Sequence, residues 1–186
     1  YLDDHPKIGA VTPKIIFANG QTDLTAHRGF PTPWASLLYA IGSDSLYHLT
    51  DRDISTVHEV DAITGAFLII RIDVLKKVGL FDEDYFMYAE DIDLCFRIKE
   101  AGWKIIYYPD VEVIHFKGIS SGLKKDSSHL TTATRETRKR SLYWFYKTMF
   151  IFYDKHYKSR YPFFVTWLVY LGIYLKWWLA KRKLTV

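Results

Sequence analysis

Cysteine is almost absent from this sequence: Cys95 is the single one among 186 residues. One thiol excludes an internal disulfide, so the fold must be stabilised in other ways, and this suits a reducing compartment. Residues 1–5 also lack the basic start and the apolar run of a secretory signal peptide. The sequence contains no internal repeat and no low-complexity tract, which excludes repeat architectures.

Hydrophobic residues make up 49% of the chain and aromatic residues 17%, which excludes a disordered protein. A length of 186 residues is enough for one domain with a core. Charge is divided unevenly, because residues 1–116 carry 10 Lys and Arg against 18 Asp and Glu, whereas residues 117–186 carry 15 against 3. This asymmetry predicts a boundary near Lys117 between an acidic part and a basic, aromatic tail.

The stretch from Gly79 to His115 is the most informative part of the chain, because it concentrates carboxylates beside aromatic residues. Like charges repel and are costly to bury, so such a cluster is more often a site than scaffolding. A solvated loop would contain the same residues, and that alternative stays open. The carboxylates between positions 82 and 100 are Asp82, Glu83, Asp84, Glu90, Asp91, Asp93 and Glu100.

Apolar residues recur at helical spacing from Glu90 to Ala101, which predicts a helix that ends at Gly102. Glu90, Asp91 and Asp93 fall in its first turn, where the helix dipole favours negative charge. The simplest interpretation is that these acids cap the helix. The same placement keeps Asp91 ionised at neutral pH, as a general base must be, so capping and catalysis are both compatible with the sequence.

Gly65 marks either a close backbone approach to a ligand or a bulge. Apolar runs and turn residues predict further elements along the chain. The expected elements are a strand over residues 8–17, a helix over 34–41 with Thr32 as N-cap and Pro33 at its first position, a strand over 60–71 after a glycine turn, a helix over 73–78 with Asp73 as N-cap, and strands over 103–108 and 111–115 separated by Pro109.

Four runs occur in a fixed order: KIGAVTPKI, TGAFLIIR, GLFDEDYFMYAEDIDLCFRIKEAGW and YYPDVEVIHFKGISS. Together they resemble the second half of the inverting family 2 glycosyltransferases, and among these the bacterial rhamnosyltransferase-type enzymes of surface-polysaccharide assembly. The resemblance covers residues 6–121. It implies an α/β fold, namely the second half of a GT-A (Rossmann-like) domain followed by C-terminal helices, with residues 1–116 as its acceptor-side, catalytic part.

The resemblance also implies roles for individual residues. The family's acid pair falls on Glu90 and Asp91, and Asp91 would be the catalytic base. Glu90 and Asp82 would bind acceptor hydroxyls or hold Asp91 in place, and the turn at Gly65 and Ala66 would line the pocket for the acceptor or the donor. The expected reaction moves a sugar such as rhamnose, with inversion, from a nucleotide-sugar donor to a glycan or polyprenyl-linked acceptor.

A divalent metal, Mn²⁺ or Mg²⁺, is implied as the Lewis acid that offsets the charge of the leaving diphosphate. His115 is its expected ligand, and imidazole suits manganese better than magnesium. Lys117 and Ser120 are expected to contact phosphate, although a solvated loop explains them almost as well. The aspartates that bind metal and nucleotide in the family's first half have no counterpart here. We therefore expect a chain that lacks the donor-binding half and is inactive alone.

The tail, residues 117–186, predicts helices that associate with a membrane. Residues 161–175 contain no charge, and at 1.5 Å per residue they would span about 22 Å, short of a ~30 Å hydrocarbon core. Trp167, Trp177 and Trp178, with basic residues after them, suit an interfacial helix on anionic lipid. We expect a helix on the cytoplasmic face of the bacterial inner membrane, with a transmembrane span or a soluble helix as alternatives.

Two other classes of function are compatible with parts of the sequence. One is a non-catalytic, membrane-attached glycan-binding module in which the acids only cap a helix. Thermal stabilisation by acceptor sugars would indicate binding of this kind. The other is a nucleic-acid-binding tail, which basic and aromatic residues permit. The uncharged run is too apolar for a solvated groove, so no nucleic-acid partner is expected.

Overall fold

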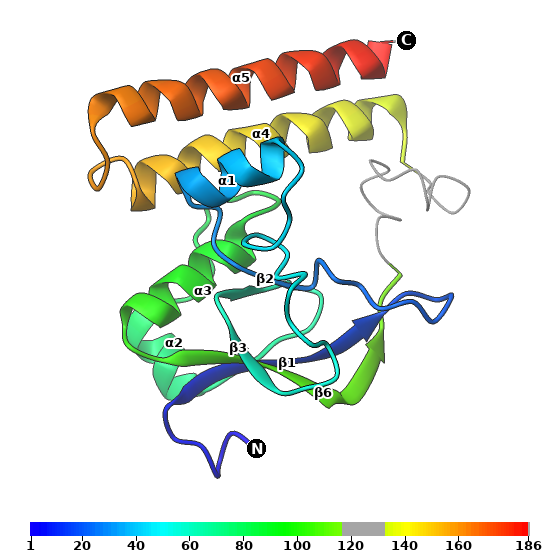
Figure 1. Ribbon diagram of the computed structural model, residues 1–186, viewed down its shortest axis with the longest axis vertical. Helices are drawn as coiled ribbons and strands as arrows, with labels where there is room; N and C mark the ends of the chain where they lie inside the picture. The colour runs from blue at the N-terminus through cyan, green and yellow to red at the C-terminus, as the bar shows by residue number, and fades with distance from the viewer. Residues whose placement is uncertain (117–132, 186) are drawn as a thin grey trace. The chain divides into compact units, whose positions relative to one another are not determined.

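The computed structural model describes residues 1–116 and 133–185 and has a mixed α/β architecture, which confirms the α/β class (Figure 1). The elements in chain order are β1 (Ile8–Ile16), β2 (His27–Arg28), α1 (Pro33–Ala40), β3 (His58–Val60), β4 (Ala62–Ile63), β5 (Ile69–Ile70), α2 (Ile72–Val78), α3 (Glu90–Glu100), β6 (Lys104–Ile114), α4 (Arg135–His156) and α5 (Phe163–Thr185).

The chain divides into two compact units. Unit 1 comprises Tyr1–Asp82 and Glu90–His115, and unit 2 comprises Glu83–Ala89 and Phe116–Val186. Unit 1 contains all the strands and helices α1 to α3, whereas unit 2 contains α4 and α5. The short segment from Glu83 to Ala89 therefore leaves unit 1 between α2 and α3, which the sequence pattern did not indicate.

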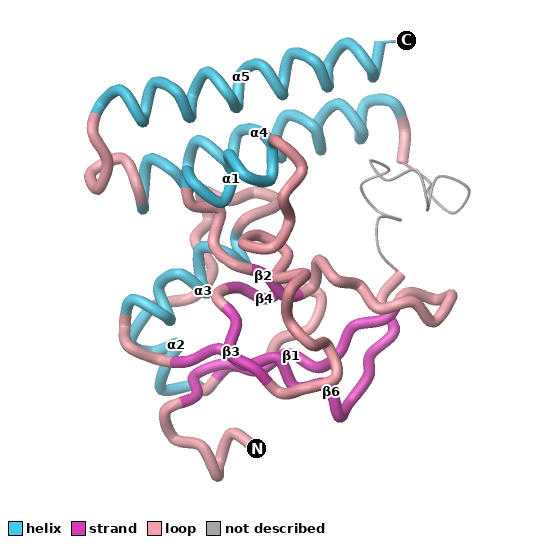
Figure 2. Tube along the Cα trace, viewed as in Figure 1, coloured by secondary structure: helices cyan, strands magenta, loops and turns pink. Residues whose placement is uncertain are grey.

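Unit 1 is built on a four-stranded sheet in the order β3-β6-β1-β5, of which β1, β3 and β6 are labelled in Figure 2. The two central strands, β1 and β6, are parallel, and the outer strands β3 and β5 pair with them antiparallel. Parallel strands are usually buried on both faces, which explains why β1 is a nearly continuous run of buried residues. Ile8, Val11 and Ile106 from this central pair pack together in the core. The strand expected over residues 8–17 is thus confirmed.

The region around Pro109 is one continuous strand, β6, and the prediction of two strands separated by that proline is wrong. Tyr108 pairs with Pro13, but the next pair of the ladder joins Glu112 to Lys14. The residues between Tyr108 and Glu112 therefore form a bulge. A bulge accommodates proline, because its residues need not donate to the ladder.

Residues 60–71 contain the last residue of β3 and the two short strands β4 and β5, so the prediction of a single buried strand is also wrong. β4 pairs with β2 in a separate two-stranded sheet, whereas β5 pairs with β1 in the main sheet. The turn that contains Gly65 separates them. The N-cap of α2 is Arg71, and Asp73 lies in the first turn of that helix instead of capping it.

Helices α1 and α3 match the sequence-based expectation closely. The Thr32 hydroxyl accepts a hydrogen bond from the Ala35 N–H at 3.1 Å, and Pro33 starts α1. The segment after α3 turns at Gly102, whose φ of +86° favours glycine. α3 packs against α2, β4 and β6, and this buried position fixes the acids in its first turn.

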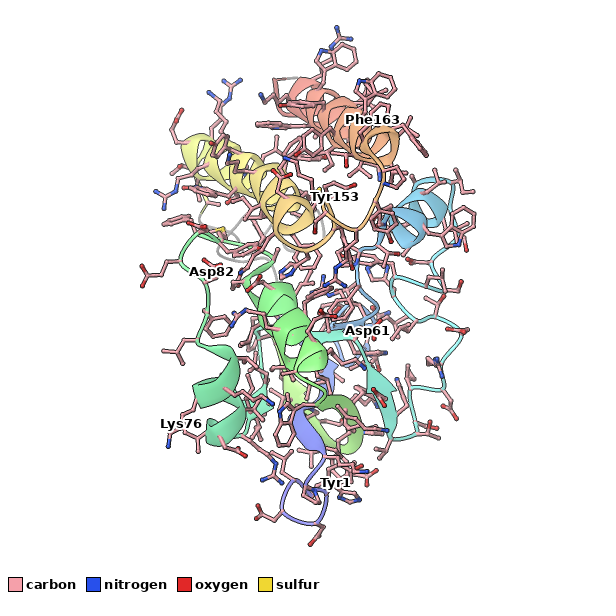
Figure 3. All side chains as sticks on the ribbon, turned by 90° about the vertical axis from the view of Figure 1, so that its left-hand side faces the viewer. Tyr1, Asp61, Lys76, Asp82, Tyr153 and Phe163 are labelled. Atoms are coloured by element: carbon pink, nitrogen blue, oxygen red, sulfur yellow. The ribbon has the colours of Figure 1, made fainter. Side chains whose placement is uncertain are left out.

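Unit 2 is dominated by the antiparallel helices α4 and α5, which lie side by side (Figures 1 and 3). The Thr134 hydroxyl caps α4 by accepting a hydrogen bond from the Thr137 N–H at 3.2 Å. Tyr153 on α4 and Thr166 on α5 share a hydrogen bond of 3.0 Å between their hydroxyls. The helices are thus joined close to the turn that connects them.

Candidate active site

Asp91 is the second residue of α3 and lies in a buried environment. The chain enters the helix through Tyr88 and Ala89, whose φ angles of +70° and +65° are in the left-handed region. Two consecutive non-glycine residues in that region are uncommon, and such strained conformations concentrate at functional sites. This sharp entry places Glu90 and Asp91 at the very start of α3.

The Asp91 carboxylate is held by three groups from different parts of unit 1. One oxygen, Oδ1, accepts a hydrogen bond from the Ile92 N–H at 2.8 Å. The other oxygen, Oδ2, accepts a hydrogen bond from the Gly65 N–H at 2.9 Å and lies 3.8 Å from the Arg28 guanidinium. A carboxylate that only capped α3 would need the helix N–H alone, so the contacts with Gly65 and Arg28 require another explanation.

Arg28, on β2, is a site residue that the sequence analysis missed. Its side chain is 18% exposed, and Nη1 lies 3.5 Å from the Tyr47 hydroxyl oxygen. Burial alone would lower the pKa of Arg28, but the Tyr47 hydroxyl and the Asp91 carboxylate outweigh it and raise the pKa above its usual value. The Nε–H group is buried and has no hydrogen-bond partner among the described residues. Arg28 is therefore a fixed positive charge with one unused donor.

Glu90 lies beside Asp91 and differs from it in its environment. Burial, followed by the neighbouring Asp91 charge, raises the pKa of Glu90. Its Oε2 atom is buried and makes no hydrogen bond within the described part of the chain. A Cβ atom placed on Gly65 would lie 3.7 Å from the Asp91 Cβ and 3.9 Å from Glu90 Oε1. The turn at Gly65 thus lies beside both acids.

The other predicted site residues lie elsewhere in the chain. Ala66 is exposed on the turn next to Gly65. Asp82 is on the loop between α2 and α3, as labelled in Figure 3. His115 follows β6, where its backbone N–H donates to the Ile16 carbonyl oxygen at 2.8 Å. Neither Asp82 nor His115 contacts the Asp91 carboxylate in the described structure.

The predicted phosphate contacts, Lys117 and Ser120, lie outside the described residues. The described residues also contain no group of three or more His, Cys, Asp or Glu side chains that could hold a metal ion. His115 by itself offers one imidazole. The side chains that the structure describes therefore do not supply a complete set of ligands for Mn²⁺ or Mg²⁺.

Cys95, on the buried side of α3, is a structural residue. Burial raises the pKa of its thiol to about 12, and the thiol lies 4.0 Å from the Ile63 carbonyl oxygen. A thiol of this kind is protonated at neutral pH and is not a nucleophile. The interpretation of Cys95 as a small buried apolar residue is consistent with this environment.

Comparison with curated proteins gives short but clear similarities. The chain is 43% identical over 75 residues to an N-acetylglucosaminyl-diphospho-decaprenol L-rhamnosyltransferase of Mycobacterium tuberculosis, covering 40% of this chain and 24% of that protein. It is 44% identical over 57 residues to the rhamnosyltransferase WbbL of Escherichia coli, covering 31% and 22%. It is 31% identical over 85 residues to the low-salt glycan biosynthesis hexosyltransferase Agl10 of Haloferax volcanii, covering 46% and 27%.

The matched region spans about a quarter of the length of these relatives. No solved structure matches the chain significantly. The model of the family described as "Glycosyltransferase like family 2" matches residues 10–146, which include β1 from its third residue, all the other strands, α1 to α3 and the first half of α4. This match covers most of the chain, and the chain therefore belongs to glycosyltransferase-like family 2.

Proposed function

We propose that unit 1 is the acceptor-side, catalytic part of a GT-A glycosyltransferase and that Asp91 is its general base. The observation that carries this proposal is the fixation of one carboxylate by groups from β2, the turn after β4 and α3 itself. A helix cap does not need a guanidinium and a backbone N–H from distant segments. A general base must be correctly aimed, and these contacts fix the orientation of the carboxylate.

In the proposed reaction, an acceptor hydroxyl attacks the anomeric carbon of the donor sugar on the face opposite the nucleoside diphosphate. As the new C–O bond forms, the bond to the diphosphate breaks and the hydroxyl proton passes to the Asp91 carboxylate. The anomeric configuration is inverted because there is a single displacement. A carboxylate offers about four acceptor positions, so Asp91 can accept this proton while it keeps its contacts with Gly65 and Arg28. General-base help of this kind contributes about 10²–10⁴-fold.

Glu90 is proposed to bind the acceptor sugar. Its buried Oε2 atom has no hydrogen-bond partner among the described residues, and leaving such a group unpaired costs roughly 1–3 kcal/mol. A sugar hydroxyl would donate to that oxygen and remove this cost on binding. Arg28 Nε–H is a buried donor that also has no partner among the described residues, so a sugar that reaches this corner of unit 1 would find both a donor and an acceptor.

The described side chains around His115 and Asp91 do not form a ligand set for a metal ion. Mn²⁺ or Mg²⁺ would need ligands from the donor diphosphate or from residues that the structure does not describe. His115 can contribute at most one nitrogen to such a site.

The proposed substrates and location follow from similarity and composition. Two of the relatives are named as rhamnosyltransferases, one of them acting on a decaprenol-linked sugar, which favours a rhamnosyl donor and a polyprenyl-linked acceptor. Such an acceptor lies in a membrane, and unit 2 has a basic, aromatic helical hairpin. We therefore place the protein on the cytoplasmic face of the bacterial inner membrane, in surface-polysaccharide synthesis.

The test is Asp91→Asn in the full-length protein that carries this sequence, assayed for sugar transfer with a polyprenyl-linked acceptor. We expect turnover to fall by about 10²–10⁴-fold, while donor binding by calorimetry stays close to that of the parent and circular dichroism shows that the variant is folded. Glu100→Gln, at the exposed far end of α3, is the matched control and should keep its activity.

Unchanged turnover in the Asp91→Asn variant would contradict the role of this residue. If the parent instead binds acceptor sugars but transfers nothing from any nucleotide sugar, the glycan-binding module becomes the better explanation.

A further inference from the structure

Helix α5 presents large apolar side chains to solvent along most of its length. The segment Phe163–Lys183 is apolar enough to cross a membrane, and none of its apolar window is buried. Residues on this outer face include Phe163, Phe164, Trp167, Leu168, Leu171, Leu175, Trp178 and Leu179, all of them exposed. A helix of a soluble protein normally shows the opposite arrangement, with its apolar side turned inward.

The inner face of α5, which includes Thr166, Tyr170 and Trp177, packs on α4. Thr166 bonds Tyr153 at 3.0 Å, and the Tyr170 hydroxyl donates to the Asp154 carboxylate. Further along, the ring of Trp177 stacks on that of Tyr146 with centroids 6.0 Å apart. The pairing therefore extends along most of α5 and leaves the apolar face outward.

We propose that α5 lies flat in the boundary between headgroups and acyl chains of an anionic bilayer, with α4 on its aqueous side, and does not cross the membrane. This inference rests on the membrane location proposed above and specifies how that location is reached. The outer face of α5 would enter the acyl region, where its exposed Phe, Trp and Leu side chains leave water.

Charge supports an anionic lipid surface as the occupant of this face. From Lys155 to Val186 the sequence has seven Lys and Arg residues and no Asp or Glu. Arg182 lies over the Trp178 ring at 3.6 Å, and Lys181 lies over the Trp177 ring at 4.0 Å. Tryptophan beside a basic side chain is typical of the headgroup level, and each cation near anionic lipid contributes about 1 kcal/mol.

The pairing with α4 argues against a transmembrane orientation of α5. By length and composition alone, Phe163–Lys183 could cross a membrane. However, α4 runs alongside, and its residues Lys147, Asp154 and Lys155 are exposed. A crossing α5 would carry these charges into the hydrocarbon, at about 2.5–3.5 kcal/mol for each charge near the centre. A flat orientation keeps α4 in water and buries only the apolar face of α5.

The first experiment measures binding of the 186-residue chain to vesicles by co-sedimentation. Vesicles of phosphatidylcholine and phosphatidylglycerol in equal parts should bind the chain, and binding should weaken with added salt and with phosphatidylcholine alone. Leu168→Glu/Leu175→Glu, on the outer face, should lower the partition coefficient by at least about tenfold. Ile72→Glu/Leu80→Glu, which changes two equally exposed apolar residues of unit 1, is the matched control and should bind as the parent does.

The second experiment determines whether α5 crosses the bilayer. Single variants Ser159→Cys, in the exposed turn before α5, and Lys183→Cys place a thiol near either end of the helix, and the native chain with its buried Cys95 gives the background. When the protein is added to sealed vesicles, a membrane-impermeant maleimide should label both positions before lysis. Labelling of one end only would overturn the flat orientation.

Two results would overturn the proposal as a whole. One is the absence of binding to anionic vesicles, which would assign the outer face to a protein partner. The other is equal binding of the two double variants. Vesicle binding and thiol labelling are both independent of sugar transfer, and Asp91→Asn should bind vesicles as the parent does. A failure of the proposed enzyme activity is therefore distinguished from a failure of this inference.

Discussion

The buried histidine His27 should make the folded protein measurably less stable in mild acid. The side chain is 1% exposed at the start of β2. Its ring packs against Tyr107 at 4.4 Å and His58 at 5.5 Å between centroids, and neither ring nitrogen has a hydrogen-bond partner among the described residues. Burial, followed by the neighbouring His58, lowers the pKa of His27 to about 4. Asp23 opposes this shift only in part.

The size of the effect follows from the two pKa values. In the unfolded chain His27 titrates near its ordinary value of 6.5. Above that pH the residue is neutral in both states and stability is unaffected. As the pH falls from 6.5 towards 4, the unfolded chain binds a proton that the folded chain does not, so the free energy of unfolding decreases. The decrease is ~2 kcal/mol at pH 5 and approaches ~3 kcal/mol below pH 4.

The assay is urea denaturation of the parent and of His27→Phe at pH values between 7.5 and 5. The phenyl ring keeps the aromatic contacts with Tyr107 and has no group to titrate, so the variant should lose ~2 kcal/mol less than the parent over this range. His5→Phe, at an exposed histidine, is the control and should follow the parent. Equal losses in the parent and in His27→Phe would refute the assignment of the acid sensitivity to this buried ring.

Two further predictions concern the site. Arg28→Gln removes the charge that faces Asp91, so kcat should fall. Arg97→Gln, which breaks the 2.9 Å pair with Asp93 on the same helix, should lower stability and leave kcat close to that of the parent. An unchanged kcat in Arg28→Gln would contradict the positioning role. Gly65→Ala should fold normally by circular dichroism, because its Cβ meets only ordinary contacts, but should raise KM for the acceptor by filling space beside the acids. An unchanged KM would show that the acceptor does not approach this turn.

Local sequence patterns predicted several elements well because the determining interactions are local. The apolar spacing and the first-turn acids of α3, and the Thr32-Pro33 start of α1, depend on residues within one or two turns. The sequence patterns failed where strand boundaries depend on which distant strand a segment pairs with. Pro109 sits within a strand because a bulge accommodates it, and residues 60–71 divide because β4 and β5 pair with different strands.

The candidate site likewise contains residues that local sequence patterns predicted and one that depends on contacts between distant segments. Glu90, Asp91 and Gly65 were identified from the sequence, through the acid cluster and the family resemblance, and the structure brings them together. Arg28 was not identified, because no local signal distinguishes one arginine on a two-residue strand. Its proximity to Asp91 results from the pairing of β2 with β4, which lies next to the turn at Gly65.

The sequence alone determined the family, the α/β class and the helix that begins with paired acids, because these depend on motif order, composition and short-range spacing. Only the tertiary structure decided that the Asp91 carboxylate meets a guanidinium, that His27 is buried without hydrogen-bond partners among the described residues, and that the apolar side of α5 faces outward. The physical reason is that charge pairing, desolvation and exposure depend on which distant segments come into contact, and one-dimensional patterns contain little information about those contacts.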